Sequence, residues 1–100
     1  QEVRLEWSAL AVDDRERIFD FSEQDDPRAA IAVDERIATQ VLLLMQFPEG
    51  GRPGRIEGTR ELVIRRTPYI VAYRIERDGV RILRVLHSAQ MWPGGMTDLL

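Results

Sequence analysis

The stretch that decides the fold is residues 69–87, which read YIVAYRIERDGVRILRVLH. A strand is predicted at Tyr69–Glu76, with Tyr69, Val71, Tyr73 and Ile75 on one face. Asp78-Gly79 then predicts a tight hairpin turn of the favoured type. The returning strand, Val80–His87, has apolar residues on both faces, so we expect it to lie in the middle of the sheet. Residues 69–87 are therefore predicted to form a β-hairpin at the centre of an antiparallel sheet.

Two further strands flank this hairpin in the sequence. Arg60–Arg65 is predicted to be a strand that ends at a turn formed by Thr67-Pro68. Glu2–Trp7 alternates charged and apolar residues and predicts a half-buried strand near the start of the chain. Because helices follow it, this first strand must return to pair with one of the later strands. We expect it beside the last or the second-last strand, and the sequence leaves both positions open.

Two helices are predicted between the first strand and the others. Ser8 is placed to cap a helix that runs to about Ser22, with an apolar stripe through Ala11, Ile18 and Phe21, and residues 23–26 are predicted to be a loop. Asp26 and Pro27 then predict the start of a second helix that runs to about Gln46. Its apolar face comprises Ala30, Val33, Ile37, Val41 and Leu44, and Leu42, Leu43 and Met45 are expected to widen the buried surface. Helices joined so closely are expected to pack as an antiparallel hairpin.

The predicted order is therefore β-α-α-β-β-β in a single domain, residues 1–100. We expect an α+β fold in which an antiparallel sheet carries the N-terminal helical hairpin on one face. A short C-terminal helical turn is predicted at Ser88–Met91, before Pro93. The Gly- and Pro-rich residues 50–55 lack the spacing and the Lys of a phosphate-binding loop, so they are interpreted as a connector.

Composition limits the classes of function. The chain has no cysteine, so disulfides and thiolate metal sites are excluded, and its acidic pairs are interpreted as helix caps and solvated faces. We expect no metal and no cofactor. Residues 1–50 hold twelve acids and five Arg, whereas residues 51–100 hold five acids and nine Arg. The helices are therefore predicted to be acidic and the sheet basic, with different partners. The longest apolar run is too short to cross a membrane and no leader opens the chain, so we expect a cytoplasmic protein that does not bind membranes.

A set of short motifs resembles the RelE/ParE family of bacterial toxins over nearly the whole chain. They are Trp7-Ser8, Pro27 with Ala29-Ala30, Phe47-Pro48, Gly51-Arg52, Gly58-Thr59-Arg60-Glu61-Leu62, Tyr69-Ile70-Val71, Tyr73-Arg74, residues 82–87 and Trp92-Pro93. The resemblance implies a toxin of a chromosomal or plasmid addiction pair, held inactive in a hetero-oligomer by a cognate ParD- or RelB-like antitoxin. It also implies one of two targets. ParE-like toxins poison DNA gyrase, and RelE-like toxins cut messenger RNA on the ribosome.

The RelE-like alternative, an endoribonuclease, requires a general acid, a general base and cations for the phosphate. Candidates are His87 as acid or base, Arg60 and Arg84 as phosphate clamps, and Tyr73 or Tyr69 as a proton donor. Strand alternation predicts His87 on the same face as Arg81, Leu83 and Val85, with Arg84 on the opposite face. The favoured interpretation of His87 is a strand-end residue hydrogen-bonded to backbone. A net charge of −3 disfavours binding to ribosomal RNA.

The ParE-like alternative requires a docking surface and no acid–base pair. Candidate contacts to gyrase are Arg84, Met91 and Trp92, because Arg and aromatic residues are favoured at contact hot spots; Trp92 is also interpreted as a lid over the core. We expect the antitoxin to lay an amphipathic helix on the helical hairpin and to reach the sheet beyond it. Its predicted contacts are Ile37, Val41, Leu42, Leu43, Met45, Arg60, Arg74 and Arg81. A non-toxic interaction module of the same fold is the third alternative.

Overall fold

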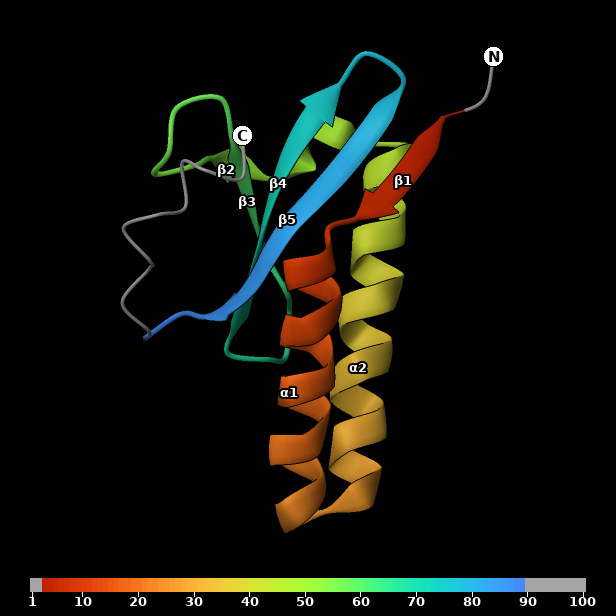
Figure 1. The fold of residues 1–100 in the computed structure, drawn as a ribbon, viewed down its shortest axis with the longest axis vertical. Helices are drawn as coiled ribbons and strands as arrows, with labels where there is room; N and C mark the ends of the chain where they lie inside the picture. The colour runs from red at the N-terminus through yellow and green to blue at the C-terminus, as the bar shows by residue number, and fades with distance from the viewer. Residues whose placement is uncertain (1–2, 90–100) are drawn as a thin grey trace.

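The computed structural model describes residues 3–89, which form a two-layer α+β fold (Figure 1). A helical hairpin packs on one face of a five-stranded sheet whose order is β1-β5-β4-β3-β2. The elements are β1 (Arg4–Trp7), α1 (Ala9–Asp25), α2 (Pro27–Leu42), the 3-10 turns η1 (Leu43–Met45) and η2 (Pro48–Gly50), β2 (Arg52–Pro53), β3 (Arg60–Val63), β4 (Tyr69–Glu76) and β5 (Gly79–His87). The predicted fold class and order of elements are confirmed. The short β2 was not predicted, and the predicted C-terminal turn lies mostly outside the described residues.

The sheet is mixed rather than wholly antiparallel. Strands β2 to β5 pair antiparallel in sequence order, but β1 pairs parallel to β5. Of the two positions left open for the first strand, the structure shows the one beside the last strand, and the central position predicted for β5 is confirmed. The second helix returns the chain to the end of the sheet at which β1 begins, since Met45 of η1 and Val3 line the same hollow.

Gly79 has a different role from the one predicted for it. The two turn residues are Arg77 and Asp78, and Gly79 already pairs with Glu76 as the first residue of β5. Gly79 does not have a positive φ, as a glycine in the predicted turn would require. A Cβ at this position would instead collide with the backbone of Arg4. Gly79 is therefore needed because β1 approaches the backbone of β5 closely there.

Local capping chemistry determines where the helices begin. Ser8 Oγ accepts a hydrogen bond from the Ala11 N–H at 3.0 Å, and an Asp26 carboxylate oxygen accepts one from the Arg28 N–H at 3.0 Å, so both predicted caps are confirmed. The predicted loop at residues 23–26 is wrong, since α1 continues to Asp25 and Asp26 alone separates the helices. The second helix ends four residues earlier than predicted and tightens into η1.

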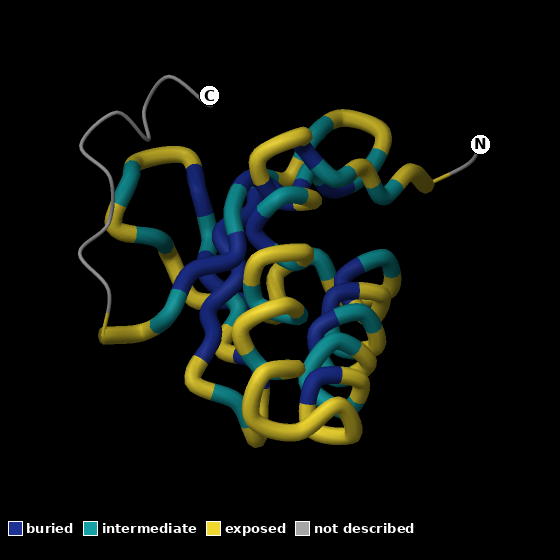
Figure 2. The backbone as a smooth tube through the Cα atoms, turned by 60° about the horizontal axis from the view of Figure 1, so that its bottom comes forward, coloured by how far each residue is buried: buried dark blue, intermediate teal, exposed yellow. Residues whose placement is uncertain are grey.

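The core lies between the hairpin and the sheet (Figure 2). It contains Ala11, Ile37, Val41, Leu44, Ile64, Tyr69, Val71, Tyr73, Val80, Ile82 and Val85. The expectation that Leu42 and Leu43 widen the buried surface is wrong, because they are 56% and 46% exposed. One side of α2 is buried through Ala30, Ile37 and Val41, and Leu44 of η1 continues it, whereas Leu42 and Leu43 point away. Phe21 is also exposed, in the half of α1 that extends past the sheet (Figure 1).

Candidate functional surfaces

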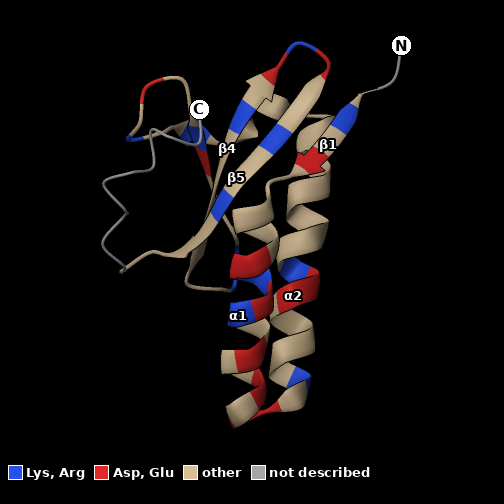
Figure 3. Ribbon diagram, viewed as in Figure 1, with Lys and Arg blue, Asp and Glu red and all other residues tan. Residues whose placement is uncertain are grey.

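A register shift in β5 decides which arginines share a face of the sheet. Tyr73 pairs with Ile82 but the neighbouring Ala72 pairs with Arg84, so β5 contains one extra residue at this point. Arg74 pairs with Arg81. Because residues 72 and 74 of β4 share a face, Arg74, Arg81 and Arg84 all lie on the face away from the helices. Figure 3 shows the arginine positions along β4 and β5 and the acidic residues along α1.

The predicted alternation along β5 is therefore wrong beyond the bulge. Val85 and Tyr69 belong to the core on the helix side, and His87 pairs with Tyr69. His87 and Arg81 accordingly lie on opposite faces, whereas they were predicted to share one. Periodicity could not place the bulge, because Ile82 and Leu83 are both apolar and either could be the extra residue.

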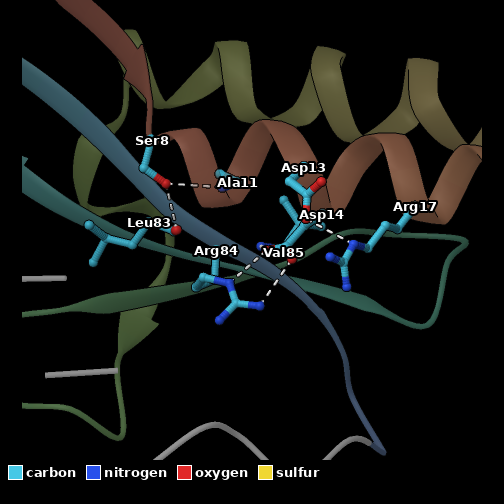
Figure 4. A network of polar contacts seen from close by, with 8 residues as sticks. All are labelled: Ser8, Ala11, Asp13, Asp14, Arg17, Leu83, Arg84 and Val85. Atoms are coloured by element: carbon cyan, nitrogen blue, oxygen red, sulfur yellow. Dashed lines mark hydrogen bonds and ion pairs between the residues drawn. The ribbon is translucent and has the colours of Figure 1, made fainter. Parts of the chain in front are cut away.

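The Arg84 side chain is held at the edge of β5 by α1 (Figure 4). Its Nε and Nη2 donate to the two carboxylate oxygens of Asp14 at 2.8 and 3.0 Å, and the Val85 N–H donates to Asp14 Oδ2 at 2.9 Å. The hydrogen bonds to Asp14 raise the pKa of Arg84 above its ordinary value, against the opposing effect of burial. Ser8 Oγ donates to the Leu83 carbonyl at 2.8 Å. The start of α1 thus closes the part of the β5 edge that β1 does not reach.

A second carboxylate, Glu61, anchors the loop between β2 and β3. Glu61 is 3% exposed and accepts hydrogen bonds from the Arg55 N–H at 2.8 Å, Arg55 Nε at 3.2 Å and Arg52 Nη2 at 3.1 Å. Burial acts to raise the pKa of Glu61, but these hydrogen bonds outweigh it and hold the pKa below its ordinary value. Glu61 therefore stays ionised and fixes two arginines at this end of the sheet.

Two of the predicted ribonuclease residues hold the segment before β2 in place. The Tyr73 hydroxyl donates to the Pro48 carbonyl at 2.6 Å and accepts from the Gly51 N–H at 2.8 Å. Arg60 donates from Nε and Nη2 to the Gly51 carbonyl at 3.0 and 2.6 Å, and from Nη2 to the Glu49 carbonyl at 3.2 Å. Arg60 pairs with Tyr73, so it lies on the helix side of the sheet, away from Arg74 and Arg81.

The other two ribonuclease candidates, His87 and Arg84, line one small hollow of ≈ 160 Å³. His87 Nδ1 accepts a hydrogen bond from the Ala89 N–H at 3.0 Å, as the alternative interpretation of a strand-end histidine predicts. The Tyr69 ring meets the His87 ring edge-on, with centroids 5.6 Å apart, and burial raises the pKa of Tyr69. The structure therefore brings His87, Arg84 and Tyr69 together, although Arg84 and His87 leave β5 on opposite faces. It does not bring Arg60 or Tyr73 to them.

The residues predicted to bind the antitoxin fall into three groups. Ile37 and Val41 are fully buried in the core, so their side chains cannot contact a partner. Leu42 and Leu43 are exposed, and Leu43 lines one hollow with Phe47, which is 64% exposed and was not predicted to be a contact. Met45 lines a hollow of ≈ 240 Å³ with Val3 and Ile75.

The predicted arginine contacts carry ion pairs within the chain. Arg74 Nη2 lies 2.6 Å from a Glu76 carboxylate oxygen, and Arg81 Nη1 lies 3.5 Å from one of Glu6. These pairs are at the surface, where each is worth about 0–1 kcal/mol, so a partner carboxylate can replace them at little cost. Met91 and Trp92, predicted to contact gyrase, lie outside the described residues.

A hollow of ≈ 360 Å³ lies on the outer side of the hairpin and was not predicted. It is lined by Val12, Arg15, Glu16, Phe19, Asp20 and Asp34. The Arg15 side chain is held in place on two sides. Its Nε and Nη2 donate to Asp34 at 3.0 and 2.8 Å, and its guanidinium stacks 4.7 Å from the centroid of the Trp7 ring. The exposed apolar side chain of Val12 and the acidic rim suit an amphipathic helix with basic flanks.

Residues 3–89 contain neither a membrane-spanning helix nor a cluster of side chains suited to a metal ion. No helix there is long and apolar enough to span a membrane. No group of three or more His, Cys, Asp or Glu side chains there is arranged to hold a metal ion.

Comparisons with known proteins identify the family. Residues 5–92 match the family described as the ParE toxin of the type II toxin–antitoxin system parDE. The chain is 49% identical over 90 residues to a Sinorhizobium fredii protein named toxin Y4kP, covering 90% of this chain and 93% of that one. It is 33% identical over 89 residues to toxin RelE2 of Caulobacter vibrioides, covering 89% and 99%.

Two solved structures share the fold and have 28% sequence identity to the chain. The first, described as a chromosomal ParDE system from P. aeruginosa, aligns with a TM-score of 0.80 over 85% of this chain and 95% of that one. The second, a RelBE2 toxin–antitoxin complex from Mycobacterium tuberculosis, aligns with a TM-score of 0.56 over 87% and 99%. The chain belongs to the ParE toxin family of type II toxin–antitoxin systems.

Proposed function

We propose that this toxin inhibits DNA gyrase in the cytoplasm and that a cognate antitoxin neutralises it by binding the helical hairpin and the arginine face of the sheet. The proposal rests on one observation, which is that three candidate ribonuclease residues already make hydrogen bonds within the chain. Tyr73, Arg60 and Arg84 each satisfy hydrogen bonds within the chain. An RNA-cleaving site needs these groups available to a phosphate and a 2′-hydroxyl.

Tyr73 and Arg60 are the clearest cases. The fully buried Tyr73 hydroxyl already donates one hydrogen bond and accepts another, so it has no proton to offer a substrate without breaking the contact with Pro48. Arg60 directs its guanidinium to the carbonyls of Glu49 and Gly51. Both residues are four or more strand positions from the Tyr69–His87 pair, which is roughly 13 Å along an extended chain. They do not form one site with His87.

Charge and similarity support the same choice of target. The net charge of −3 gives the long-range field of an acidic protein, whereas binding to ribosomal RNA draws its affinity from a basic one. The alignment with the ParDE structure has the higher TM-score of the two, 0.80 against 0.56. Gyrase contacts are proposed at Arg84, Met91 and Trp92, of which only Arg84 lies in the described part of the chain.

A RelE-like ribonuclease is the second candidate. The identity of 33% to toxin RelE2 favours it, and so does the hollow that His87, Tyr69 and Arg84 line together. In that case His87 would act as the acid or base, and Arg84 would have to leave Asp14 to reach a phosphate. The loss of a bidentate, largely buried ion pair makes such a movement costly.

The antitoxin surface is proposed to begin on the hairpin. Leu42 and Leu43 offer exposed aliphatic side chains, and the hollow beside Val12 offers a second anchor point with an acidic rim. Burial of an exposed leucine is worth about 1.5–3 kcal/mol, more than a surface ion pair. We therefore assign the affinity to apolar contacts, and the orientation of the antitoxin on the sheet to Arg74 and Arg81.

Expression of the chain alone in bacteria distinguishes the candidates. Filamentation with DNA-damage signalling is expected if gyrase is the target, and arrest of translation is expected for a ribonuclease. Co-expression of the antitoxin should restore growth in both cases. Unimpaired growth in the presence of soluble, folded protein would contradict both and leave the non-toxic interaction module.

A further inference from the structure

The outer edge of β3 presents the backbone of every second residue. The Ile64 N–H donates to the Tyr69 carbonyl at 3.0 Å, so the even-numbered residues of β3 turn their N–H and C=O groups toward β4. Glu61, Val63 and Arg65 consequently turn theirs away from β4, to the side on which β3 has only the two-residue strand β2.

All but one of these outward positions are capped within the chain. The Thr59 carbonyl accepts from the Gly54 N–H at 2.8 Å, and Glu61 pairs with Arg52 of β2. The side-chain amide of Gln40 brackets Arg65, accepting from its N–H at 2.7 Å and donating to its carbonyl at 3.1 Å. Between these caps, the outward N–H and C=O of Val63 have no hydrogen-bond partner among residues 3–89. The edge therefore has a gap one residue wide.

Apolar side chains surround this gap. A hollow of ≈ 280 Å³ lies against it, lined by Gln40, Leu43, Leu44, Phe47, Gly50, Leu62, Val63 and Arg65. Phe47 is 64% exposed and Val63 is 48% exposed, so large apolar surfaces face solvent around two unpaired backbone groups. Arg65 and the exposed Arg66 make one end of the gap basic. Exposed apolar surface next to an open strand edge is typical of a site for strand addition.

We infer that the Val63 gap is a docking site for an extended segment of the antitoxin. One residue of that segment exchanges two hydrogen bonds with the Val63 N–H and C=O and places a large apolar side chain in the hollow beside Phe47. A carboxylate that follows lies near Arg65 and Arg66. The inference rests on the antitoxin partnership in the proposed function and does not depend on whether gyrase is the target.

The geometry favours an extended segment of another protein over a second copy of this chain. In an antiparallel pair of two β3 edges centred on Val63, Arg65 of one copy would occupy the place of Arg52 beside Glu61 of the other. The two β2 strands would therefore collide with such a pair. A helix cannot occupy the gap either, because its backbone groups are bonded internally. The gap also lies between Leu43 on the hairpin side and the sheet, where a chain passing from one to the other would run.

The sharpest variant is Val63→Pro. Because the Val63 N–H makes no bond to β4, proline removes only the outward donor and is tolerated at a strand edge of this kind. Val63→Thr is the matched control, since it keeps the N–H and the shape of the side chain. We expect Val63→Pro to raise the Kd for the cognate antitoxin roughly fivefold to tenfold, the loss of one hydrogen bond. Val63→Thr should stay within about twofold.

Amide hydrogen exchange of the wild-type chain gives a second measurement that needs no variant. The Val63 amide should exchange rapidly in the free toxin and become protected in the antitoxin complex. A folded Val63→Pro variant that binds as tightly as Val63→Thr would overturn the inference. Equal exchange at Val63 in the free and bound states, or protection already present in the free toxin, would do the same. If the wild-type chain does not bind the antitoxin at all, neutralisation itself is refuted, and this inference with it.

Discussion

Asp14 and Arg84, 70 residues apart in the chain, form a bidentate ion pair in which the carboxylate also accepts a hydrogen bond from the Val85 N–H. This contact joins the start of α1 to the centre of the sheet, at the point where β1 has ended and the edge of β5 would otherwise be open. With Ser8 bound to the Ile82 and Leu83 carbonyls, it caps part of that edge without another strand. Arg84 therefore has a structural role in the fold, whether or not it also contacts a target.

Removal of this carboxylate should destabilise the fold. Asp14→Asn leaves Arg84 in a largely buried position without its counter-charge, and we expect a loss of about 2–4 kcal/mol in the free energy of unfolding. Asp13→Asn is the control, because the adjacent Asp13 pairs with Arg17 at the surface and should cost less than about 0.5 kcal/mol. Urea unfolding of both variants measures the difference. Equal losses would show that Asp14 contributes no more than a surface carboxylate.

The sequence predicted the features that depend on neighbouring residues. Ser8 and the Asp26-Pro27 pair cap the helices through their own local chemistry, so they could be recognised from spacing alone. The bulge in β5 and the role of Gly79 could not. Both depend on the neighbouring strand. An apolar Leu83 looks the same in the sequence whether β5 is bulged or regular. A glycine after Asp78 looks the same whether it lies in the turn or in the strand beside β1.

The surfaces were predicted less well than the fold, for a related reason. Periodicity identifies the apolar residues of α2, but it does not distinguish a leucine that faces the sheet from one that faces a partner. Ile37 and Val41 therefore proved to be core, and Leu42 and Leu43 surface. The gap at Val63 depends on the side chain of Gln40, which reaches Arg65 from a different element and leaves no trace in the sequence of either.

Stability should depend on pH through Glu61. The folded-state pKa of Glu61 is lowered, so its contribution is fully present above the unfolded pKa, near about 4.3, and is lost as the pH falls through the folded value. At pH 7, Glu61→Gln should lower the free energy of unfolding by about 1–3 kcal/mol. The difference in the free energy of unfolding between wild type and variant should shrink as the pH falls below about 4. The exposed Glu57→Gln is the control, and a difference that does not change with pH would refute the assignment.

Binding to the antitoxin should depend on apolar contacts more than on charge. Leu43→Asp introduces a charge into the proposed contact and should weaken binding by 100-fold or more, about 3 kcal/mol. Arg81→Ala removes a surface cation already paired with Glu6 and should change the Kd by less than about fivefold. Isothermal titration of the two folded variants against the antitoxin tests this order. Equal losses, or a larger loss for Arg81→Ala, would mean that charge provides the affinity.

His87 should be dispensable for toxicity. The His87→Ala variant keeps the Asp14–Arg84 contact, and growth inhibition should remain within about tenfold of wild type if no acid–base step is involved. Thermal unfolding of the variant checks that the strand end has stayed folded. A folded variant that loses 100-fold or more of its activity, the size of a general acid–base contribution, would favour the ribonuclease.

The most direct test of the proposed target uses the purified toxin with purified gyrase and, separately, with ribosomes that are translating a defined messenger RNA. From the gyrase proposal we expect that the toxin inhibits DNA supercoiling by gyrase, that the antitoxin relieves this inhibition, and that the messenger RNA stays intact. Cleavage of the messenger RNA on the ribosome, with gyrase activity unchanged at the same toxin concentration, would contradict it.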